Sequence, residues 1–404
     1  MSYTILRKAF HNPNMDAEAL YQSRFTHEKT IHLDIDIKGH KAFCYMDEAL
    51  FTQMLSIAKA DKKILELTQH LPPRALWQFT ERTLVDEIVI TNDIEGVIST
   101  RKEIGSILRN LEKQDKRKRF YGLVNKYMLL TQRAEISIQT LENVRAIYDD
   151  LVLNEVIAAN PKNAPDGRLF RKEPVSVYNA AGEEVHQGVR PESKIEDCLA
   201  ASLAFLENED IELPIRTAIF HFLIGHIHPF YDGNGRLNRF ISSSLLLREY
   251  EPLIGLRLSF AVIQSIQKYY KGFMVCNDIL NKGDLTPFVI MFIGIIKEAA
   301  DDVVAALTEK KDLFEINIER LEGIQEIAED KVLYGLAQIL LQVRMFSGEG
   351  IAIQDLMEYA QVSRPTIMKR LERLSALGIL EREKMGREVH YQLDLDALAQ
   401  KSKH

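Results

Sequence analysis

Most of the chain follows the spacing of amphipathic helices, in which apolar residues recur every three or four positions. Leu84, Ile88 and Thr91 share one helical face, and Glu95 extends that face with a carboxylate. Pro214 suits the first turn of another helix. The apolar positions that follow it at helical spacing are Ile215, Ala218, Ile219, Phe222 and Leu223. The pattern therefore predicts a mainly α protein.

Strand-like alternation is sparse and centres on one segment. The predicted strand comprises Val175, Ser176, Val177 and Tyr178. Asn179 to Gly182 then has the composition of a turn, and Val185 follows it. This arrangement predicts a small β-hairpin.

The C-terminal segment has a different pattern. Ile353 to Ala360 and Ser363 to Leu377 have the pattern of two short helices joined by a tight turn. Ser363 suits the cap of the second helix, which is followed by a charged tip at Lys384 to Arg387 and by alternation from Val389 to Leu393. Helix, helix and hairpin in this order predict a winged helix-turn-helix.

These patterns divide the chain into four expected parts. We expect an N-terminal helical extension over 1–104, a helical catalytic domain over 105–298, a helical connector over 299–330 and the winged helix over 331–404. A chain of 404 residues is also longer than a single hydrophobic core usually serves.

Composition narrows the class of protein. The formal net charge of −7 argues against a surface built wholly for nucleic acid. The three cysteines, Cys44, Cys198 and Cys276, lie far apart, which predicts neither disulfides nor a thiolate metal site. No apolar run approaches the ~20 residues that span a bilayer, and Met1 to Asn12 lacks the apolar core of a signal peptide. We therefore expect a cytoplasmic protein without a membrane contact.

One stretch, from His228 to Arg239, carries most of the chemistry and has the sequence HPFYDGNGRLNR. The glycines of Gly233–Gly235 allow backbone N–H groups to turn toward an anion, and a helix that starts there adds further donors. Arg236 and Arg239 are three residues apart, so both can reach phosphate oxygens from one side of that helix. Asp232 suits Mg²⁺, and His228 can accept a proton from a hydroxyl. The stretch therefore predicts a phosphate-binding site that contains a general base.

This stretch resembles the signature of the Fic family, HPFx[D/E]GNGRxxR, at every fixed position. The resemblance implies a protein adenylyltransferase that uses ATP and Mg²⁺ or Mn²⁺ to transfer AMP to a Ser, Thr or Tyr hydroxyl of a protein. It implies His228 as the base, Phe230 as a buried anchor and Asp232 as the metal ligand. The implied nucleotide-binding residues are Gly233, Asn234, Gly235, Arg236, Arg239, Tyr270 and Asn277. The predicted hairpin at Val175 to Tyr178 resembles the flap on which the family docks its target.

A second segment, TNDIEG from Thr91 to Gly96, resembles the family's inhibitory pattern [S/T]xxxE[G/N]. The resemblance implies that Glu95 binds Arg239 and blocks productive placement of the γ-phosphate. Gly235 favours AMP transfer, because the family branch that phosphorylates its targets has Lys at this position. The implied partner is a target protein with a free hydroxyl, while self-modification of the chain and a homodimer stay open.

Several alternatives stay open. The same site could remove AMP from a modified protein, or a Fic-like domain could sense nucleotide for a DNA-binding regulator. His221, His226 and His228 could instead form a metal site, although packing roles for the first two are favoured. The stretch Ser363 to Arg373 carries a net charge of +3. Its basic side chains, Arg364, Lys369, Arg370 and Arg373, predict either a solvated helix face or a contact with DNA or a protein.

Overall fold

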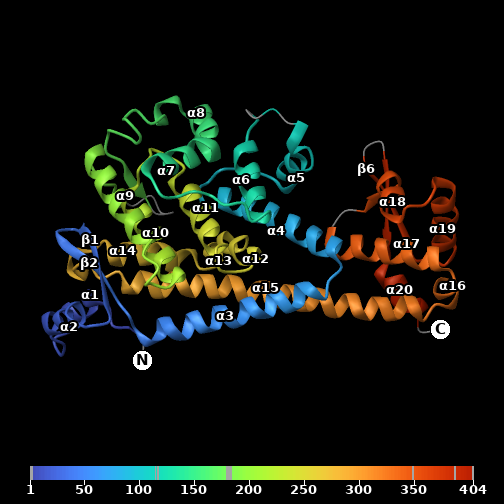
Figure 1. Ribbon diagram of the computed structural model, residues 1–404, viewed down its shortest axis with the longest axis horizontal. Coiled ribbons are helices and arrows are strands. Elements are labelled where there is room, and N and C mark those ends of the chain that lie inside the picture. The colour runs from blue at the N-terminus through green and yellow to red at the C-terminus, as the bar shows by residue number, and fades with distance from the viewer. Residues whose placement is uncertain are drawn as a thin grey trace. The chain divides into compact units, whose positions relative to one another are not determined.

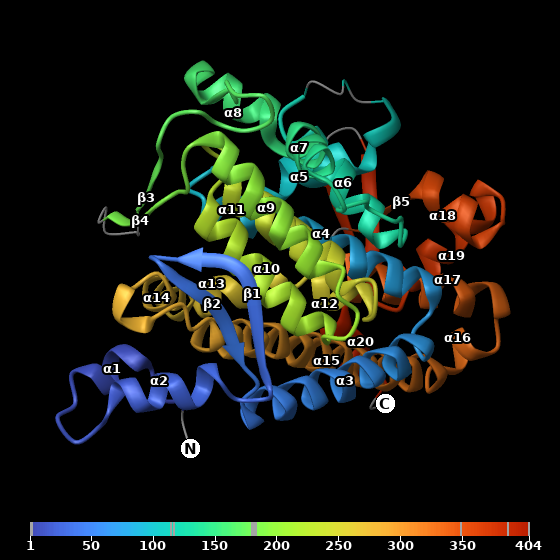
Figure 2. The ribbon, with the colours of Figure 1, turned by 60° about the vertical axis from the view of Figure 1, so that its left-hand side comes forward.

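The computed structural model describes residues 3–113, 115, 118–178, 184–347, 350–385 and 388–402. Helices dominate these residues, as predicted, and the described strands form three small antiparallel sheets (Figures 1 and 2). The chain folds into two compact units, Met1–Asp61 with Thr83–Asp301 and Lys62–Arg82 with Asp302–His404. Each unit therefore combines segments that are far apart in the sequence. None of the described helices is long and apolar enough to cross a membrane.

Helix α10 (Leu213–Ile227) is the central helix of the first unit. Nearly all its residues are buried, because apolar side chains occupy every face of the helix. It packs against α9 (Glu192–Leu206) and α11 (Asn234–Leu246). The other helices with residues in this unit are α1 (Leu6–Phe10), α2 (Ala17–Phe25), α3 (Glu48–Gln69), α4 (Pro73–Ile94), α5 (Arg101–Arg109), α6 (Tyr121–Thr131), α7 (Leu141–Tyr148), α8 (Asn154–Ala159), α12 (Pro252–Gly255), α13 (Leu258–Gln264), α14 (Ile266–Cys276) and α15 (Thr286–Glu322). The short helices are the 3₁₀ turns Leu111–Lys113, Pro161–Asn163 and Ile279–Asn281 and the π-turn Asp149–Leu153.

The N-terminal extension is not wholly helical, which corrects the expectation for this part of the chain. Strands β1 (Thr30–Ile37) and β2 (His40–Tyr45) pair antiparallel. Leu33, Ile35 and Ile37 are buried, whereas the residues between them are exposed. This strict alternation is the two-residue period of a strand with one buried face, and it overrides the helical propensity of the surrounding segments.

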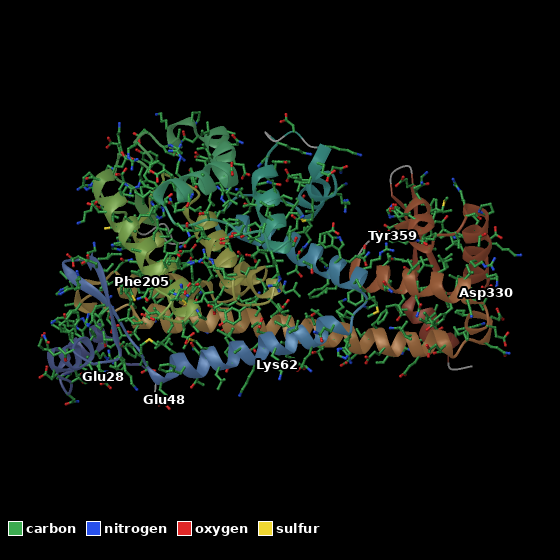
Figure 3. All side chains as sticks on the ribbon, viewed as in Figure 1. Glu28, Glu48, Lys62, Phe205, Asp330 and Tyr359 are labelled. Carbon is green, nitrogen blue, oxygen red and sulfur yellow. The ribbon has the colours of Figure 1, made fainter. Side chains whose placement is uncertain are left out.

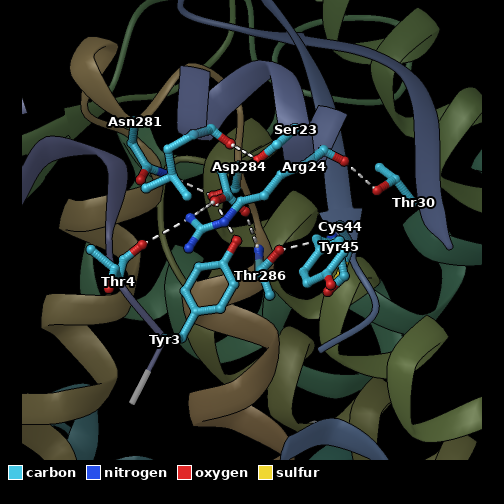
Figure 4. Close-up of polar contacts among 11 residues, drawn as sticks. Tyr3, Thr4, Ser23, Arg24, Thr30, Cys44, Tyr45, Asn281, Asp284 and Thr286 are labelled. Carbon is cyan, nitrogen blue, oxygen red and sulfur yellow. Dashed lines mark hydrogen bonds and ion pairs between the residues drawn. The ribbon is translucent and has the colours of Figure 1, made fainter. Parts of the chain in front are cut away.

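A buried carboxylate ties this N-terminal hairpin region to the loop before α15 (Figure 4). Asp284 accepts hydrogen bonds from the Tyr3 hydroxyl at 2.7 Å and from the Thr286 backbone N–H at 2.9 Å. Arg24 lies 3.5 Å from the same carboxylate, and the Tyr45 backbone N–H donates to the Thr286 hydroxyl at 2.8 Å. Burial raises the pKa of Asp284. These contacts make the N-terminal segment part of the same compact unit as the glycine-rich loop.

The predicted small hairpin is present in its described part. Strands β3 (Ser176–Tyr178) and β4 (Glu184–Gln187) pair antiparallel, with Ser176 opposite Gln187. The turn predicted at Asn179 to Gly182 lies outside the described residues. Gly188 and Val189, which follow β4, are bonded through their backbones to Val175 and Ile227. The hairpin therefore leads directly into contact with the end of α10.

The second unit contains the C-terminal helices and a three-stranded antiparallel sheet. The sheet has the order β5–β7–β6, and the predicted tip at Lys384 to Arg387 lies partly outside the described residues. Its elements are α16 (Gln325–Ala328), α17 (Lys331–Gln342), the π-turn Val343–Ser347, β5 (Ile351–Ala352), α18 (Ile353–Ala360), α19 (Arg364–Ala376), β6 (Leu380–Met385), β7 (Glu388–Leu393) and α20 (Leu395–Lys401). Helix, helix and hairpin thus follow one another in the predicted order.

Two of the four basic residues noted on α19 are engaged within this unit. Asp330, labelled in Figure 3, caps α17 and forms ion pairs with Arg370, at 3.3 Å, and with Arg373. Arg364 and Lys369 remain exposed. Ser363 occupies the cap position of α19, but its side chain makes no capping hydrogen bond and lies 3.0 Å from the Thr366 hydroxyl.

Candidate active site

The loop between α10 and α11 carries the glycine-rich motif. His228 ends α10 in the left-handed conformation, with φ 52° and ψ 64°, which is uncommon for a residue with a side chain. Gly233, with φ 78°, is the cap of α11, and the helix begins at Asn234. The backbone thus turns sharply at both ends of the loop, as a loop that approaches a ligand with its main chain requires.

Buried contacts hold this loop in shape. The ring of Phe230 stacks on Tyr148, with centroids 3.6 Å apart, and meets the edge of Phe170. The Asn234 side chain accepts from the Phe230 N–H at 3.0 Å and donates to the Phe230 carbonyl at 2.8 Å. The amide of Asn234 therefore closes the loop, so any contact of Asn234 with an anion falls to its backbone N–H.

A cavity of about 140 Å³ opens beside this loop. Seven predicted site residues line it: Glu95, His228, Asn234, Gly235, Arg239, Tyr270 and Asn277. Five further residues complete its lining: His186, Gly225, Asn238, Tyr269 and Phe273. The sequence assigned no site role to these five: Asn238 lies within the motif at a position that the family signature leaves variable, and the other four lie outside the motif. Tyr270 and Asn277 are more than 30 residues from the motif, and the fold brings them to the same cavity.

The buried arginine that lines this cavity is already paired. The Arg239 guanidinium is buried and donates to the Glu95 carboxylate at 2.9 Å, to the Thr91 hydroxyl at 2.8 Å and to the Thr91 carbonyl at 2.9 Å. The Glu95 carboxylate also lies against the glycine-rich loop, since a Cβ atom at Gly235 would be 2.1 Å from its Oε1. Thus one carboxylate both binds the arginine and lies against the glycine-rich loop at Gly235.

The other motif arginine faces elsewhere. Arg236 and Asp232 line a second cavity, of about 380 Å³, together with Arg119. Arg236 donates to the Glu155 carboxylate at 2.9 Å, and the Phe120 N–H donates to the same carboxylate at 3.0 Å. Burial raises the pKa of Glu155, although Arg236 counteracts this effect. Glu155 was not identified from the sequence, because nothing in its local pattern marks it as the partner of Arg236.

Comparisons with known proteins agree with this geometry. Residues 139–246, which include the whole glycine-rich motif, match the model of the Fic/DOC family. This part of the chain therefore belongs to the Fic/DOC family. Two curated relatives are the protein adenylyltransferases Fic of Culex quinquefasciatus, 34% identical over 119 residues, and of Drosophila melanogaster, 40% identical over 73 residues. These matches cover 29% and 18% of this chain and only 21% and 13% of the relatives.

A solved structure shares the fold of this protein. The crystal structure of a Fic family protein from Desulfovibrio desulfuricans G20 matches 86% of this chain and 97% of that one, with a TM-score of 0.52 and 20% sequence identity. The likeness therefore extends beyond residues 139–246 to most of the helical architecture.

The environment of His228 favours the neutral imidazole. Although part of its surface faces the cavity, the surrounding protein lowers the pKa of His228 to about 4, first by excluding water and then through the charge of Arg171. Glu95 acts in the opposite direction. The imidazole is therefore unprotonated near neutral pH, as a general base must be.

The other two histidines of the cluster have protein partners. His221 is fully buried, with ring nitrogens 2.7 Å from the Ser242 and Tyr269 hydroxyls, and His226 lies 2.6 Å from the Asn277 side chain. Burial lowers the pKa of both, that of His226 to about 3. Within the described residues there is no group of three potential metal ligands of the His, Cys, Asp or Glu type. These contacts support packing roles for His221 and His226.

Proposed function

We propose that this Fic protein transfers AMP from ATP to a hydroxyl side chain of a protein. The observation that carries the proposal is one cavity that contains a neutral histidine, the glycine-rich start of a helix and a buried arginine. The histidine suits proton removal, and the helix start and arginine suit a phosphate chain. The curated relatives named above support the reaction class.

The reaction assigns one role to each group. His228 takes the proton of the attacking hydroxyl, whose oxygen forms a bond to the α-phosphorus of ATP. The bond from that phosphorus to the bridging oxygen of the β-phosphate breaks, and pyrophosphate leaves with the electron pair. Backbone N–H groups at Gly233–Gly235 and the guanidinium groups of Arg236 and Arg239 stabilise the negative charge that develops on the phosphates. Tyr270 and Asn277 are the proposed contacts of the adenine ring of ATP.

The residues present fit a divalent cation next to the phosphates. Asp232 lies at the second cavity beside Arg236, and one of its oxygens accepts the Gly233 N–H. Mg²⁺ commonly uses one or two carboxylates together with phosphate oxygens and water. When bound, Mg²⁺ or Mn²⁺ would neutralise phosphate charge and favour departure of pyrophosphate.

We further propose that Glu95 inhibits the transfer. Its carboxylate occupies Arg239 and lies over Gly235, so a γ-phosphate and Glu95 compete for the same donors. Thr91 supports this arrangement by accepting two hydrogen bonds from Arg239. ATP could still bind, but with its α-phosphate misaligned for attack.

Two surfaces are proposed for partners. The β3–β4 hairpin, including Val175, Ser176, Val177 and Tyr178, offers a strand edge on which an extended target segment could pair. The C-terminal helices and sheet are proposed to form a winged helix that contacts DNA or a protein. With Arg370 and Arg373 held by Asp330, such a contact would rely on the exposed Arg364 and Lys369.

The test uses the Glu95→Gly protein, in which the inhibition is relieved, with candidate targets and Mg²⁺. Label from α-³²P-ATP should enter protein, label from γ-³²P-ATP should not, and Glu95→Gly/His228→Ala should lose at least ~100-fold of the transfer because the base is absent. Binding of ADP to both variants, measured by calorimetry, controls for folding. Transfer of the γ-label, or full activity without His228, would refute the proposed reaction.

A further inference from the structure

One buried arginine outside the motif lies directly behind the proposed base. Arg171 is fully buried, and its guanidinium donates to the His228 carbonyl at 2.8 Å and to the Ile227 carbonyl at 3.3 Å. It also donates to the Glu173 carbonyl at 2.8 Å and to the Val189 carbonyl at 2.9 Å. All four acceptors are backbone oxygens, so this side chain joins four points of the main chain.

No carboxylate of the described residues lies within ion-pair distance of Arg171. Burial lowers its pKa, which is the cost of placing a charge among neutral groups. A buried cation without an acidic partner is rare, and its carbonyl partners replace the water that it lost. A buried position that serves packing alone is more commonly occupied by an apolar side chain. The buried charge of Arg171 therefore suggests a specific role for its hydrogen bonds.

The four carbonyls belong to two parts of the fold, the end of α10 and the segments that flank the β3–β4 hairpin. Ile227 and His228 end α10, where helix carbonyls lack partners within the helix. Glu173 precedes strand β3, and Val189 follows strand β4. The planar guanidinium therefore connects both ends of the hairpin to the backbone of His228.

Backbone hydrogen bonds reinforce this connection. The Arg171 N–H donates to the Pro229 carbonyl at 3.2 Å, and the Val189 N–H donates to the Ile227 carbonyl at 3.0 Å. Gly188 allows the close approach, because a Cβ atom there would lie 2.3 Å from Arg171 Nη2 and 3.1 Å from the His228 Cβ atom. The position of His228 thus depends on Arg171 and on the absence of a side chain at Gly188.

We propose that Arg171 is a positioning residue that aligns His228 with the β3–β4 hairpin, so that the base and the docked target hydroxyl meet in one geometry. The inference rests on the transfer reaction proposed above. Arg171 does not line the cavity beside the loop. Its loss should therefore change the rate of transfer more than the binding of nucleotide.

The experiment compares variants in the Glu95→Gly protein. Arg171→Gln removes the charge and most of the N–H donors of the guanidinium group. The kcat should then fall about 100-fold, as expected for a general base misplaced by ~1 Å. ADP affinity with Mg²⁺, measured by calorimetry, should stay within about threefold, since the nucleotide contacts remain. Arg168→Gln is the matched control, because Arg168 is exposed and pairs with Glu196 and Glu142 at the surface.

Gly188→Ala tests the same contact without touching the arginine. The added methyl group should displace the guanidinium and lower kcat, and it should have little further effect when Arg171→Gln is already present, because the two changes act on one contact. The Arg171 charge lowers the pKa of His228, so the acid limb of the pH profile of kcat/KM should move to higher pH in Arg171→Gln. His186 is present in both compared proteins and Glu95 is absent from both, so neither residue contributes to this difference.

Four outcomes separate the interpretations. An unchanged kcat in both Arg171→Gln and Gly188→Ala overturns the positioning role, and so does a parallel loss of kcat and ADP affinity, which indicates a structural role only. If Arg171→Gln does not fold, Gly188→Ala decides the question on the same criteria. Absence of transfer by the Glu95→Gly parent itself contradicts the proposed function instead; the histidine titration, followed by NMR in Arg171→Gln, then tests the contact with His228.

Discussion

The two arginines of the motif lie three residues apart on one helix, yet their glutamate partners differ in origin and exposure. Arg236 is paired with Glu155, which belongs to the matched Fic/DOC region and has a side chain only 10% exposed. Arg239 is paired with Glu95, which lies outside that region and has a side chain 23% exposed. The distances are equal, at 2.9 Å. Geometry alone therefore does not separate a permanent ion pair from one that can open.

The surroundings of the two pairs do separate them. Glu155 is also held by the Phe120 N–H and lies at the second cavity, which does not include His228 or Gly235 in its lining. Glu95 follows the last turn of α4 and lies over Gly235 inside the cavity of His228. We infer that Glu155 supports Arg236 during the reaction, whereas Glu95 must leave Arg239 before the reaction. Opposite effects of the two removals would establish this difference.

The largest expected effect is activation by Glu95→Gly. Freed of the carboxylate, Arg239 can receive phosphate, and AMP transfer, including self-modification, should rise roughly 100-fold, the factor that a ~1 Å misalignment costs. Incorporation of α-³²P label is the measurement. Asp93→Gly, at an exposed position of the same segment, is the control and should leave the rate unchanged. Equal transfer by Glu95→Gly and the wild type would leave Glu95 without an inhibitory role.

Removal of Glu155 should lower AMP transfer, whereas removal of Glu95 should raise it. Glu155→Ala, made in the Glu95→Gly protein, should lower transfer about tenfold, because Arg236 loses the group that orients it. It should also lower the free energy of unfolding by about 3 kcal/mol, since a buried charge is left unpaired. Thermal or urea denaturation measures the second effect.

The exposed pair of Asp150 with Lys126 provides the control for this loss of stability. Asp150→Ala should cost less than about 1 kcal/mol, because its side chain is 63% exposed. Activation by Glu155→Ala would contradict the division of roles between the two glutamates.

The smallest expected effect concerns the protonation of His228. Glu95 raises the pKa of His228, so Glu95→Gly should move it below the value of about 4 in the wild type. Glu155→Ala should leave it unchanged. The titration of the His228 ring proton can be followed by NMR and assigned by its loss in His228→Ala. At pH 5.5 the base should remain neutral in all three proteins, and a midpoint near 6.5 would show that burial does not control it.

Elements with strong local signals could be predicted from the amino-acid sequence alone. The apolar spacing after Pro214 predicted α10, and the glycine-rich motif predicted a loop that leads into a helix. The order of the C-terminal elements followed from their patterns as well. The β1–β2 hairpin was missed although Leu33, Ile35 and Ile37 alternate with polar residues, because the helical interpretation of the extension was given priority. Local periodicity is visible in a sequence because each element buries one face.

Which charged groups meet became apparent in the folded structure. Glu155 and Arg236 are 81 residues apart, and Arg171 and His228 are 57 apart, so no local pattern could pair them. Asp330 captures two arginines of α19 that the sequence alone left as a basic face. Hydrogen bonds and ion pairs depend on distances of about 3 Å, which are set by how helices pack rather than by their sequence spacing. For this reason the motif could be recognised in the sequence, whereas the groups that hold and align it became visible in the fold.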